Sequence, residues 1–301
     1  MMCFIFVPIL LPAQPATFRA GVTLVKVDAS VTDRGGRTIT GLAQQDFEVF
    51  DENAAQKILY FERESDPLDL LLVLDVSGSM HLSLGELARS ARAAMRPLGS
   101  QDRGAVMLFA RNSLLTRRLT SDLASVERAI QSATDAQDLG SGTAINAAIV
   151  SAASYFRDET VKARRAILIV TDNLSLNYRI PDEEVIRELY AADATLNAIL
   201  VGKQYRPPLP KPGTYVNPDF TPSDVFKLAD ATGGEALESR QAGESFERMV
   251  ERIRSRYRLQ YEAPPGEAGH LRHIRVQLAP AARGRYPKAT IRARTGYYAV
   301  Q

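Results

Sequence analysis

The sequence has a single cysteine and almost no net charge. Cys3 is the only cysteine in 301 residues, and it lies in the apolar stretch 1–11. A chain that lost this stretch would form no disulfide, so cysteine usage says nothing about its compartment. The formal net charge of +2 gives no overall bias toward nucleic acid, and we expect no nucleic-acid partner.

Long apolar runs are also missing. The stretch 1–11 is too short to cross a bilayer as a helix, so we expect no transmembrane span. It is typical of the apolar part of a secretory signal peptide that ends near Ala13 or Ala16. We therefore interpret residues 1–16 as a signal peptide, with a truncated start because no basic residue precedes it, and expect a secreted, periplasmic or cell-envelope protein. The alternative is a buried first strand.

The most informative stretch of the chain begins with an apolar run at residues 70–74. Asp75, Ser77 and Ser79 follow it directly. The run predicts a buried parallel strand, and open α/β sheets bind ligands at the carboxyl ends of such strands. All three side chains offer oxygen, which suits a hard cation such as Mg²⁺.

Two later segments supply further oxygen ligands. Thr143 follows a glycine-rich turn and opens a helix-like run, and Asp172 ends a second apolar strand at residues 165–172. Each segment alone is weak, because helix caps and turns use the same residue types. In this order, and with strands and helices between them, they predict a metal site made of Asp75, Ser77, Ser79, Thr143 and Asp172.

This pattern resembles the metal-ion-dependent adhesion site (MIDAS) of von Willebrand factor A (VWA) domains and integrin I domains, over residues 66–256. The resemblance implies that Ser77, Ser79 and Thr143 contact the metal, whereas Asp75 and Asp172 act mostly through water. It also implies that a partner protein supplies an Asp or Glu carboxylate to the metal.

Two details depart from relatives. Asn173 stands where many of them have glycine, which alters the loop and removes no ligand. The acids that build a second site in some integrins are absent at residues 80–83, so we expect one metal, Mg²⁺ with Mn²⁺ or Ca²⁺ as alternatives.

The sequence favours a non-enzymatic, metal-dependent protein-binding module with an adhesion or scaffold role. A metal-dependent hydrolase is one alternative, because His81 lies near the proposed site and a bound water can be activated. No nucleophile elbow accompanies it, and residues 140–142 lack the lysine of a phosphate-binding loop. The other alternative is a VWA subunit that regulates an intracellular ATPase complex.

Strands and helices alternate in residues 66–256, which predicts a doubly wound, mostly parallel sheet with an antiparallel edge strand at 113–120. Residues 17–65 and 257–301 read as short strands, with a hairpin expected between the runs 47–50 and 57–61 and a strand at 289–298. Neither segment has enough strands for a core by itself. We therefore expect the two to form one smaller β-sandwich into which the VWA domain is inserted. This layout resembles a bacterial family of secreted VWA-related proteins, through the segments 41–49 and 294–298.

Two further features could contribute to binding. Tyr205, Tyr215 and Phe220 lie in a proline-rich loop at 203–222, which follows a strand end and is either a partner-recognition loop or a passive insertion. Residues 256–301 carry nine Arg or Lys and two acids. This excess predicts either a solvated sandwich face or a weak contact with anionic surfaces.

Overall fold

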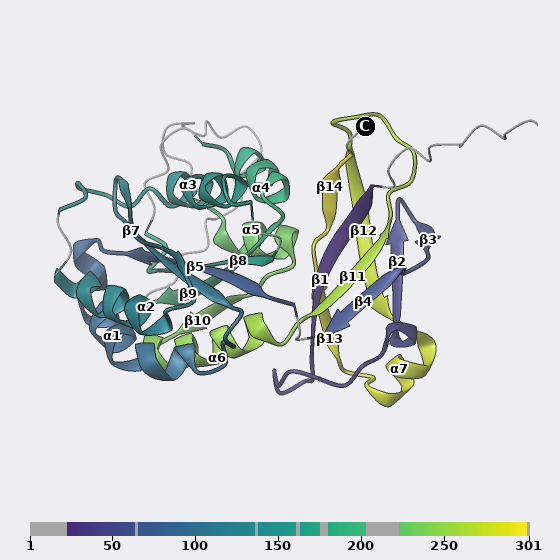
Figure 1. Cartoon of the computed structure of the whole chain (residues 1–301), viewed down its shortest axis with the longest axis horizontal. Coiled ribbons are helices and arrows are strands. Elements are labelled where there is room, and N and C mark those ends of the chain that lie inside the picture. Colours follow the sequence, from purple (N-terminus) through teal and green to yellow (C-terminus); the bar gives the residue numbers. More distant parts are fainter. Residues whose placement is uncertain are drawn as a thin grey trace, which may run out of the picture.

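The computed structural model describes residues 23–63, 66–135, 138–160, 163–174, 180–202 and 223–299. In this part of the chain, two bodies lie next to each other: a sheet covered by helices, and an all-β body (Figure 1). The predicted signal peptide and the predicted recognition loop lie outside the described residues.

The first body is built on a six-stranded sheet in the order β10-β9-β8-β5-β6-β7. Its strands are β5 (Leu68–Asp75), β6 (Arg103–Phe109), β7 (Ser113–Thr120), β8 (Arg164–Thr171), β9 (Ala194–Val201) and β10 (Ala236–Ser239). All neighbouring strands are parallel except β7, which is the antiparallel edge strand expected from the sequence. Every residue of β5 is buried, as its apolar run predicts.

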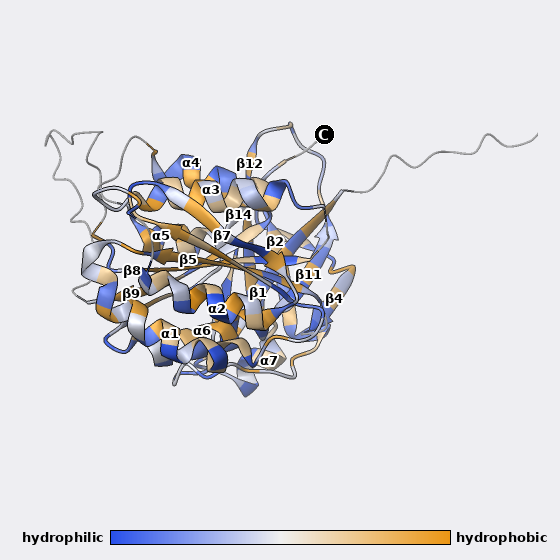
Figure 2. Cartoon of the chain, turned by 60° about the vertical axis from the view of Figure 1, so that its left-hand side comes forward, coloured by the Kyte–Doolittle hydropathy of each residue, from blue (hydrophilic) through white to orange (hydrophobic). Residues whose placement is uncertain are grey.

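Helices cover both faces of this sheet. Alternate side chains of β5 point to opposite faces, and because all of them are apolar or buried, each face packs against its own set of helices. Leu70 and Leu72 pack into a core with α1 (His81–Met95), α2 (Leu123–Gln131) and α6 (Ala242–Arg254). Leu71 and Val73 pack into the other core, with α3 (Ile145–Arg157), α4 (Asp182–Ala191) and α5 (Val225–Thr232). In Figure 2 the central strands are hydrophobic, whereas the helices also carry hydrophilic residues.

The second body consists of two antiparallel four-stranded sheets, β13-β1-β11-β4 and β14-β12-β2-β3. Its elements are β1 (Leu24–Thr32), β2 (Phe47–Asp51), β3 (Ala54–Gln56), β4 (Tyr60–Arg63), β11 (Tyr257–Glu262), β12 (Leu271–Leu278), α7 (Pro280–Arg285), β13 (Thr290–Ala293) and β14 (Gly296–Tyr298). The pairs β1–β11 and β2–β12 join the two ends of the chain. The expected fold class, an α/β domain inserted into a β-sandwich, is therefore confirmed.

Some of the local sequence interpretation was wrong. The run 57–61 does not form a hairpin with β2, because β3 already pairs with β2. Its strand β4 lies in the other sheet, paired with β11. The run 289–298 splits into β13 and β14, which belong to different sheets. The short elements β10 and α7 were not anticipated.

A buried carboxylate ties the two sheets of the sandwich together. Asp51 is fully buried and accepts hydrogen bonds from the hydroxyls of Tyr261 (2.8 Å) and Tyr297 (2.9 Å) and from Arg272 Nε (2.8 Å). Tyr261 stands on β11 in one sheet, whereas the other three residues stand in the opposite sheet. Burial, and then the adjacent Asp51, raise the pKa of both tyrosines, that of Tyr297 to about 12.

Much of the basic excess near the C-terminus is used in ion pairs. The pairs are Arg258 with Asp28 and Asp66, Arg272 with Asp51, Arg285 with Asp46, Arg292 with Asp230, and Arg294 with Asp193. These acids come from earlier in the chain, so the pairs join segments that lie far apart in the sequence. No helix in the described part of the chain is long and apolar enough to span a membrane.

The two crossings between the bodies lie beside each other. Arg164 donates its backbone N–H to Pro67 O and its Nη2 to Arg254 O, both at 2.8 Å. Asp102 accepts the N–H of Leu68 at 2.9 Å and forms an ion pair with Arg254 at 2.8 Å. The chain therefore enters the helix-covered body at the start of β5 and leaves it at the end of α6, close to the same point.

Candidate metal centre

The candidate centre begins at the carboxyl end of β5, where the apolar strand delivers Asp75. The Asp75 side chain is fully buried. The next residue, Val76, donates its N–H to Phe109 O at 2.8 Å, which fixes the end of β5 against the end of β6. The sequence therefore places a carboxylate at the strand end that usually forms the ligand site of an open α/β sheet.

The loop after Asp75 brings two hydroxyls together. Ser77 donates its N–H to Asp75 Oδ1 at 2.9 Å, and Ser77 Oγ lies 3.3 Å from Ser79 Oγ. A short 3₁₀ turn over Gly78–Met80 follows, and the buried Met80 side chain anchors it in the core. Three of the five predicted residues therefore share one compact loop.

Strand β8 supplies the acid on the neighbouring side. Thr171, its last residue, donates its hydroxyl to Asp75 Oδ2 at 2.6 Å. Asp172 follows immediately, is 6% exposed, and accepts the N–H of Leu174 at 3.0 Å. Asp172 therefore lies beside Asp75 at the same sheet edge. Thr171 was not among the predicted site residues, although its position next to Asp172 at the end of a buried strand was a usable signal.

Asn173 adopts a backbone conformation that favours glycine. Its backbone φ is +60°, in the left-handed region that glycine adopts at no steric cost. Asparagine is among the few other residues that tolerate this region. Asn173 can therefore form the tight turn that follows Asp172.

Thr143 reaches the same edge from a third segment. The next residue, Ala144, donates its N–H to Ala110 O at 2.8 Å, and Ala110 directly follows the end of β6. Thr143 itself is 4% exposed and precedes α3, which begins at Ile145 rather than at residue 144. Since β6 is the neighbour of β5, the structure brings the loop of Thr143 to the edge that holds Asp75.

Burial and the neighbouring Asp172 disfavour the charged form of Asp75. Burial raises the pKa of Asp75, hydrogen bonds from Thr171 and Ser77 oppose this, and the nearby Asp172 raises the pKa further. Neither carboxylate forms an ion pair with a basic side chain among the described residues. A cation would relieve the repulsion between them.

The donor set fits a hard cation bound largely through hydroxyls. In the part of the chain that the structure describes, no three His, Cys, Asp or Glu side chains gather closely enough to hold a metal ion. A cation at this edge would therefore need Ser77, Ser79 and Thr143 in addition to the two carboxylates. Such oxygen-only ligation suits Mg²⁺, Mn²⁺ or Ca²⁺.

Two exposed apolar side chains lie close in the sequence to the predicted ligands and were not among the predicted binding residues. Leu82, in the first turn of α1, is 82% exposed, and Leu174, two residues after Asp172, is 56% exposed. His81 is exposed at the start of α1. The predicted contact residues Tyr205, Tyr215 and Phe220 lie outside the described residues.

A family model for the von Willebrand factor type A domain matches residues 70–174, which contain all five predicted ligands. This segment is therefore similar to a VWA domain, and we call the helix-covered body the VWA domain from here on. No curated protein matches the sequence. The match covers the end of β5, the loop of Thr143 and the end of β8, so it includes the elements from which the candidate site is built.

Solved structures resemble the chain at low identity. An aerotolerance-related membrane protein from Bacteroides fragilis NCTC 9343 is 20% identical, with 62% of this chain and 98% of that chain covered and a TM-score of 0.46. A von Willebrand factor type A structure from Catenulispora acidiphila is 13% identical, with 92% and 75% covered and a TM-score of 0.48. The pilus adhesin SpaC from Lactobacillus rhamnosus GG is 11% identical, with 84% and 48% covered and a TM-score of 0.45.

Proposed function

We propose that this chain is a protein-binding module whose VWA domain takes a divalent cation at the carboxyl edge of β5 and binds an acidic side chain of a partner protein. The observation that carries the proposal is the meeting of three distant segments at one edge. The loop of Asp75 bonds to Thr171 from β8, and the loop of Thr143 is bonded to the end of β6.

The residues at this edge would have different roles toward the cation. Ser77, Ser79 and Thr143 would offer hydroxyl oxygens to the cation, and Asp75 already holds the Ser77 backbone in place. Asp75 and Asp172 would supply the negative charge nearby. Mg²⁺ takes six oxygens at about 2.0–2.1 Å, and neutral hydroxyls leave much of its charge available to a carboxylate from outside.

Two exposed leucines support the choice of a protein as partner. Leu82 and Leu174 stand exposed a few residues from the candidate ligands, and a partner that covered them would remove their apolar surface from water. We infer that the partner presents its Asp or Glu within a segment that also carries apolar residues. His81, at the start of α1, is the basis of the hydrolase alternative, and its side chain makes no contact with the described residues that would favour catalysis.

The first test is a titration of the purified chain with Mn²⁺, in which electron paramagnetic resonance measures the concentration of the free ion. We expect one site per chain, competed by Mg²⁺. The Ser77→Ala/Ser79→Ala variant should bind at least about tenfold more weakly, because two direct ligands are lost. The matched control is Ser121→Ala/Ser151→Ala. It makes the same chemical change just before α2 and within α3, and it should bind Mn²⁺ as the unchanged protein does.

The second test compares capture of partner proteins from an envelope extract in Mg²⁺ and in EDTA. A partner retained only with the cation, and lost with Ser77→Ala/Ser79→Ala, agrees with the proposal. Equal retention in EDTA refutes the metal bridge. Metal-dependent hydrolysis of simple esters or phosphates that disappears with Asp75→Ala would favour an enzyme instead.

We also propose that the protein acts outside the cytoplasm, in the periplasm, the cell envelope or the medium. The apolar stretch 1–11 and the small residues after it support this location. Sequencing of the mature N-terminus tests it. A start after Ala13 or Ala16 agrees with export, and a protein that keeps its first residues favours the intracellular ATPase-associated alternative.

A further inference from the structure

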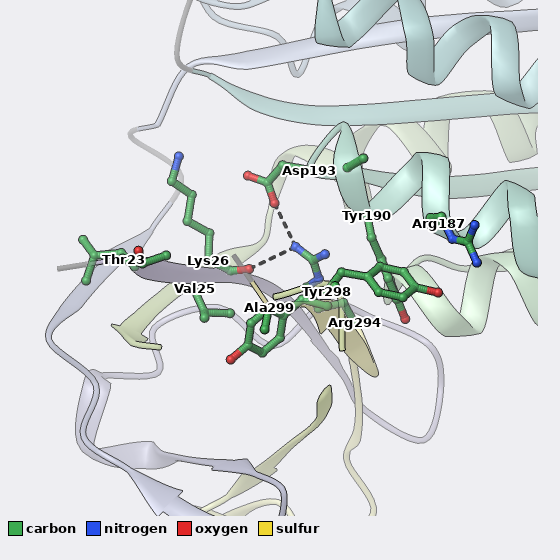
Figure 3. A pocket seen from close by; sticks show the side chains of 13 residues that line it. Thr23, Val25, Lys26, Arg187, Tyr190, Asp193, Arg294, Tyr298 and Ala299 are labelled. Atoms are coloured by element: carbon green, nitrogen blue, oxygen red, sulfur yellow. Dashed lines mark hydrogen bonds and ion pairs between the residues drawn. The ribbon is translucent and has the colours of Figure 1, made fainter. Parts of the chain in front are cut away.

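A cleft of about 710 Å³ lies between the VWA domain and the sandwich (Figure 3). Its volume is within the range of pockets that hold small ligands. Asp193 lines it and directly precedes β9, so the cleft opens at the amino edge of the parallel sheet. The candidate metal centre occupies the carboxyl edge, and the two sites are therefore distinct.

Aromatic rings form part of the cleft wall. The rings of Tyr190, on α4, and Tyr298, on β14, lie 6.2 Å apart and are tilted against each other. Tyr190 donates its hydroxyl to Ala231 O at 2.9 Å, which fixes that ring. Val25 and Ala299 add apolar surface from the sandwich. The cleft thus presents a largely apolar wall to which both bodies contribute.

The charges around this wall do not cancel. Asp193 forms an ion pair with Arg294 at 2.9 Å, and the guanidinium of Arg294 also stacks over Tyr190 at 4.8 Å. Lys26 and Arg187 have no ion-pair partner among the described residues. Figure 3 shows these two cations at opposite ends of the cleft, with the tyrosines between them.

Arg187 is placed to receive an anion. It is exposed on α4, and its guanidinium lies 5.6 Å from the centre of the Tyr298 ring. A guanidinium stacked on a ring keeps its N–H groups free at the edge, where a carboxylate or sulfonate can accept two of them. Such a charge-assisted bond is roughly twice as strong as a neutral one.

We propose that this cleft binds a small amphipathic anion, with its apolar or aromatic body against Tyr190 and Tyr298 and its acidic head on Arg187. Lys26 adds attraction from the other end of the cleft. The ligand touches both the VWA domain and the sandwich, so its binding stabilises their junction by mass action. This site goes beyond the proposed metal-dependent function and needs no metal.

The probe for the test is 8-anilinonaphthalene-1-sulfonate, a fluorescent aromatic anion, titrated into the full chain. We expect saturable binding of one probe per chain, weakened about tenfold by Arg187→Glu because a charge-assisted contact becomes a repulsion. Ala191→Trp places a large ring in the cleft from an exposed position on α4, and should block binding by volume alone. Decanoate, a second amphipathic anion, should compete with the probe.

The matched control is Arg89→Glu, which reverses an exposed charge on α1, on the other face of the sheet. It should bind the probe as the parent does, and so should the parent in EDTA and the Ser77→Ala/Ser79→Ala variant. The proposal is overturned if no saturable binding occurs at millimolar probe, if Ala191→Trp binds unchanged, or if Arg89→Glu weakens binding as much as Arg187→Glu.

Discussion

Replacing Asp51 by alanine should destabilise the sandwich more than any surface ion pair can. The change removes the acceptor of Arg272, Tyr261 and Tyr297 in one step. It leaves a guanidinium whose side chain is 14% exposed without its counter-charge. Breaking one partner of a buried ion pair costs about 3–5 kcal/mol, and we expect the free energy of unfolding to fall by this amount.

The control is an ion pair of the same chemistry at the surface. In the pair Arg292–Asp230 the side chains are 37% and 67% exposed. Exposed pairs contribute about 0–1 kcal/mol, so Asp230→Ala should change the free energy of unfolding by less than about 1 kcal/mol. Asp51→Asn keeps the shape and one acceptor oxygen, and should fall between the two.

Urea unfolding followed by circular dichroism and tyrosine fluorescence measures these differences, since the chain has eleven tyrosines and no tryptophan. The sandwich and the VWA domain can unfold in separate steps, and the transition that moves in Asp51→Ala identifies the step of the sandwich. The reasoning is refuted if Asp51→Ala and Asp230→Ala lower the free energy of unfolding by equal amounts.

Two further predictions concern alkaline pH and a glycine. The pKa of Tyr297 is raised from 10.0 to about 12, so its contribution to stability is fully present below pH 10 and is lost as the pH rises through 12. Tyr297→Phe should flatten this loss in urea unfolding at pH 9–12, and an unchanged slope would contradict the assignment. At Gly234 an added Cβ would lie 1.7 Å from Leu196 O, so Gly234→Ala should lower the free energy of unfolding by more than about 3 kcal/mol. Gly284→Ala, with no heavy atom within 4 Å, should be neutral or stabilising by up to about 1 kcal/mol, and equal effects of the two would refute the argument.

The VWA part of the fold could be predicted because its signals are local. The run 70–74 is apolar at every position, and a strand buried on both faces requires this. Asp75 and Asp172 follow such strands directly, so parallel pairing of β5 with β8 brings their ends to one edge without further information. Position in the sequence and strand direction were enough to indicate the candidate site.

The sandwich was harder because its pairing is not local. β1 pairs with β11, so that Leu24 stands opposite Glu262 at the other end of the chain. A hairpin between neighbouring strands is the usual prediction for a short segment. For the run 57–61 this prediction was wrong, because β4 pairs with β11 and not with β2. Contacts such as Arg258 with Asp28 settle the arrangement, and no local pattern reveals them.

The two chain crossings, at Pro67 and Arg254, determine how a pulling force would act on the VWA domain. β5 starts at this junction and runs seven residues onward to Asp75, a span of roughly 23 Å at the usual rise of a strand. A pull applied at Asp75 would load β5 lengthwise, and its ladders with β6 and β8 on either flank would resist in shear, with all their hydrogen bonds strained at once. The same geometry places Asp75 at the end of β5 that lies away from the crossings to the sandwich.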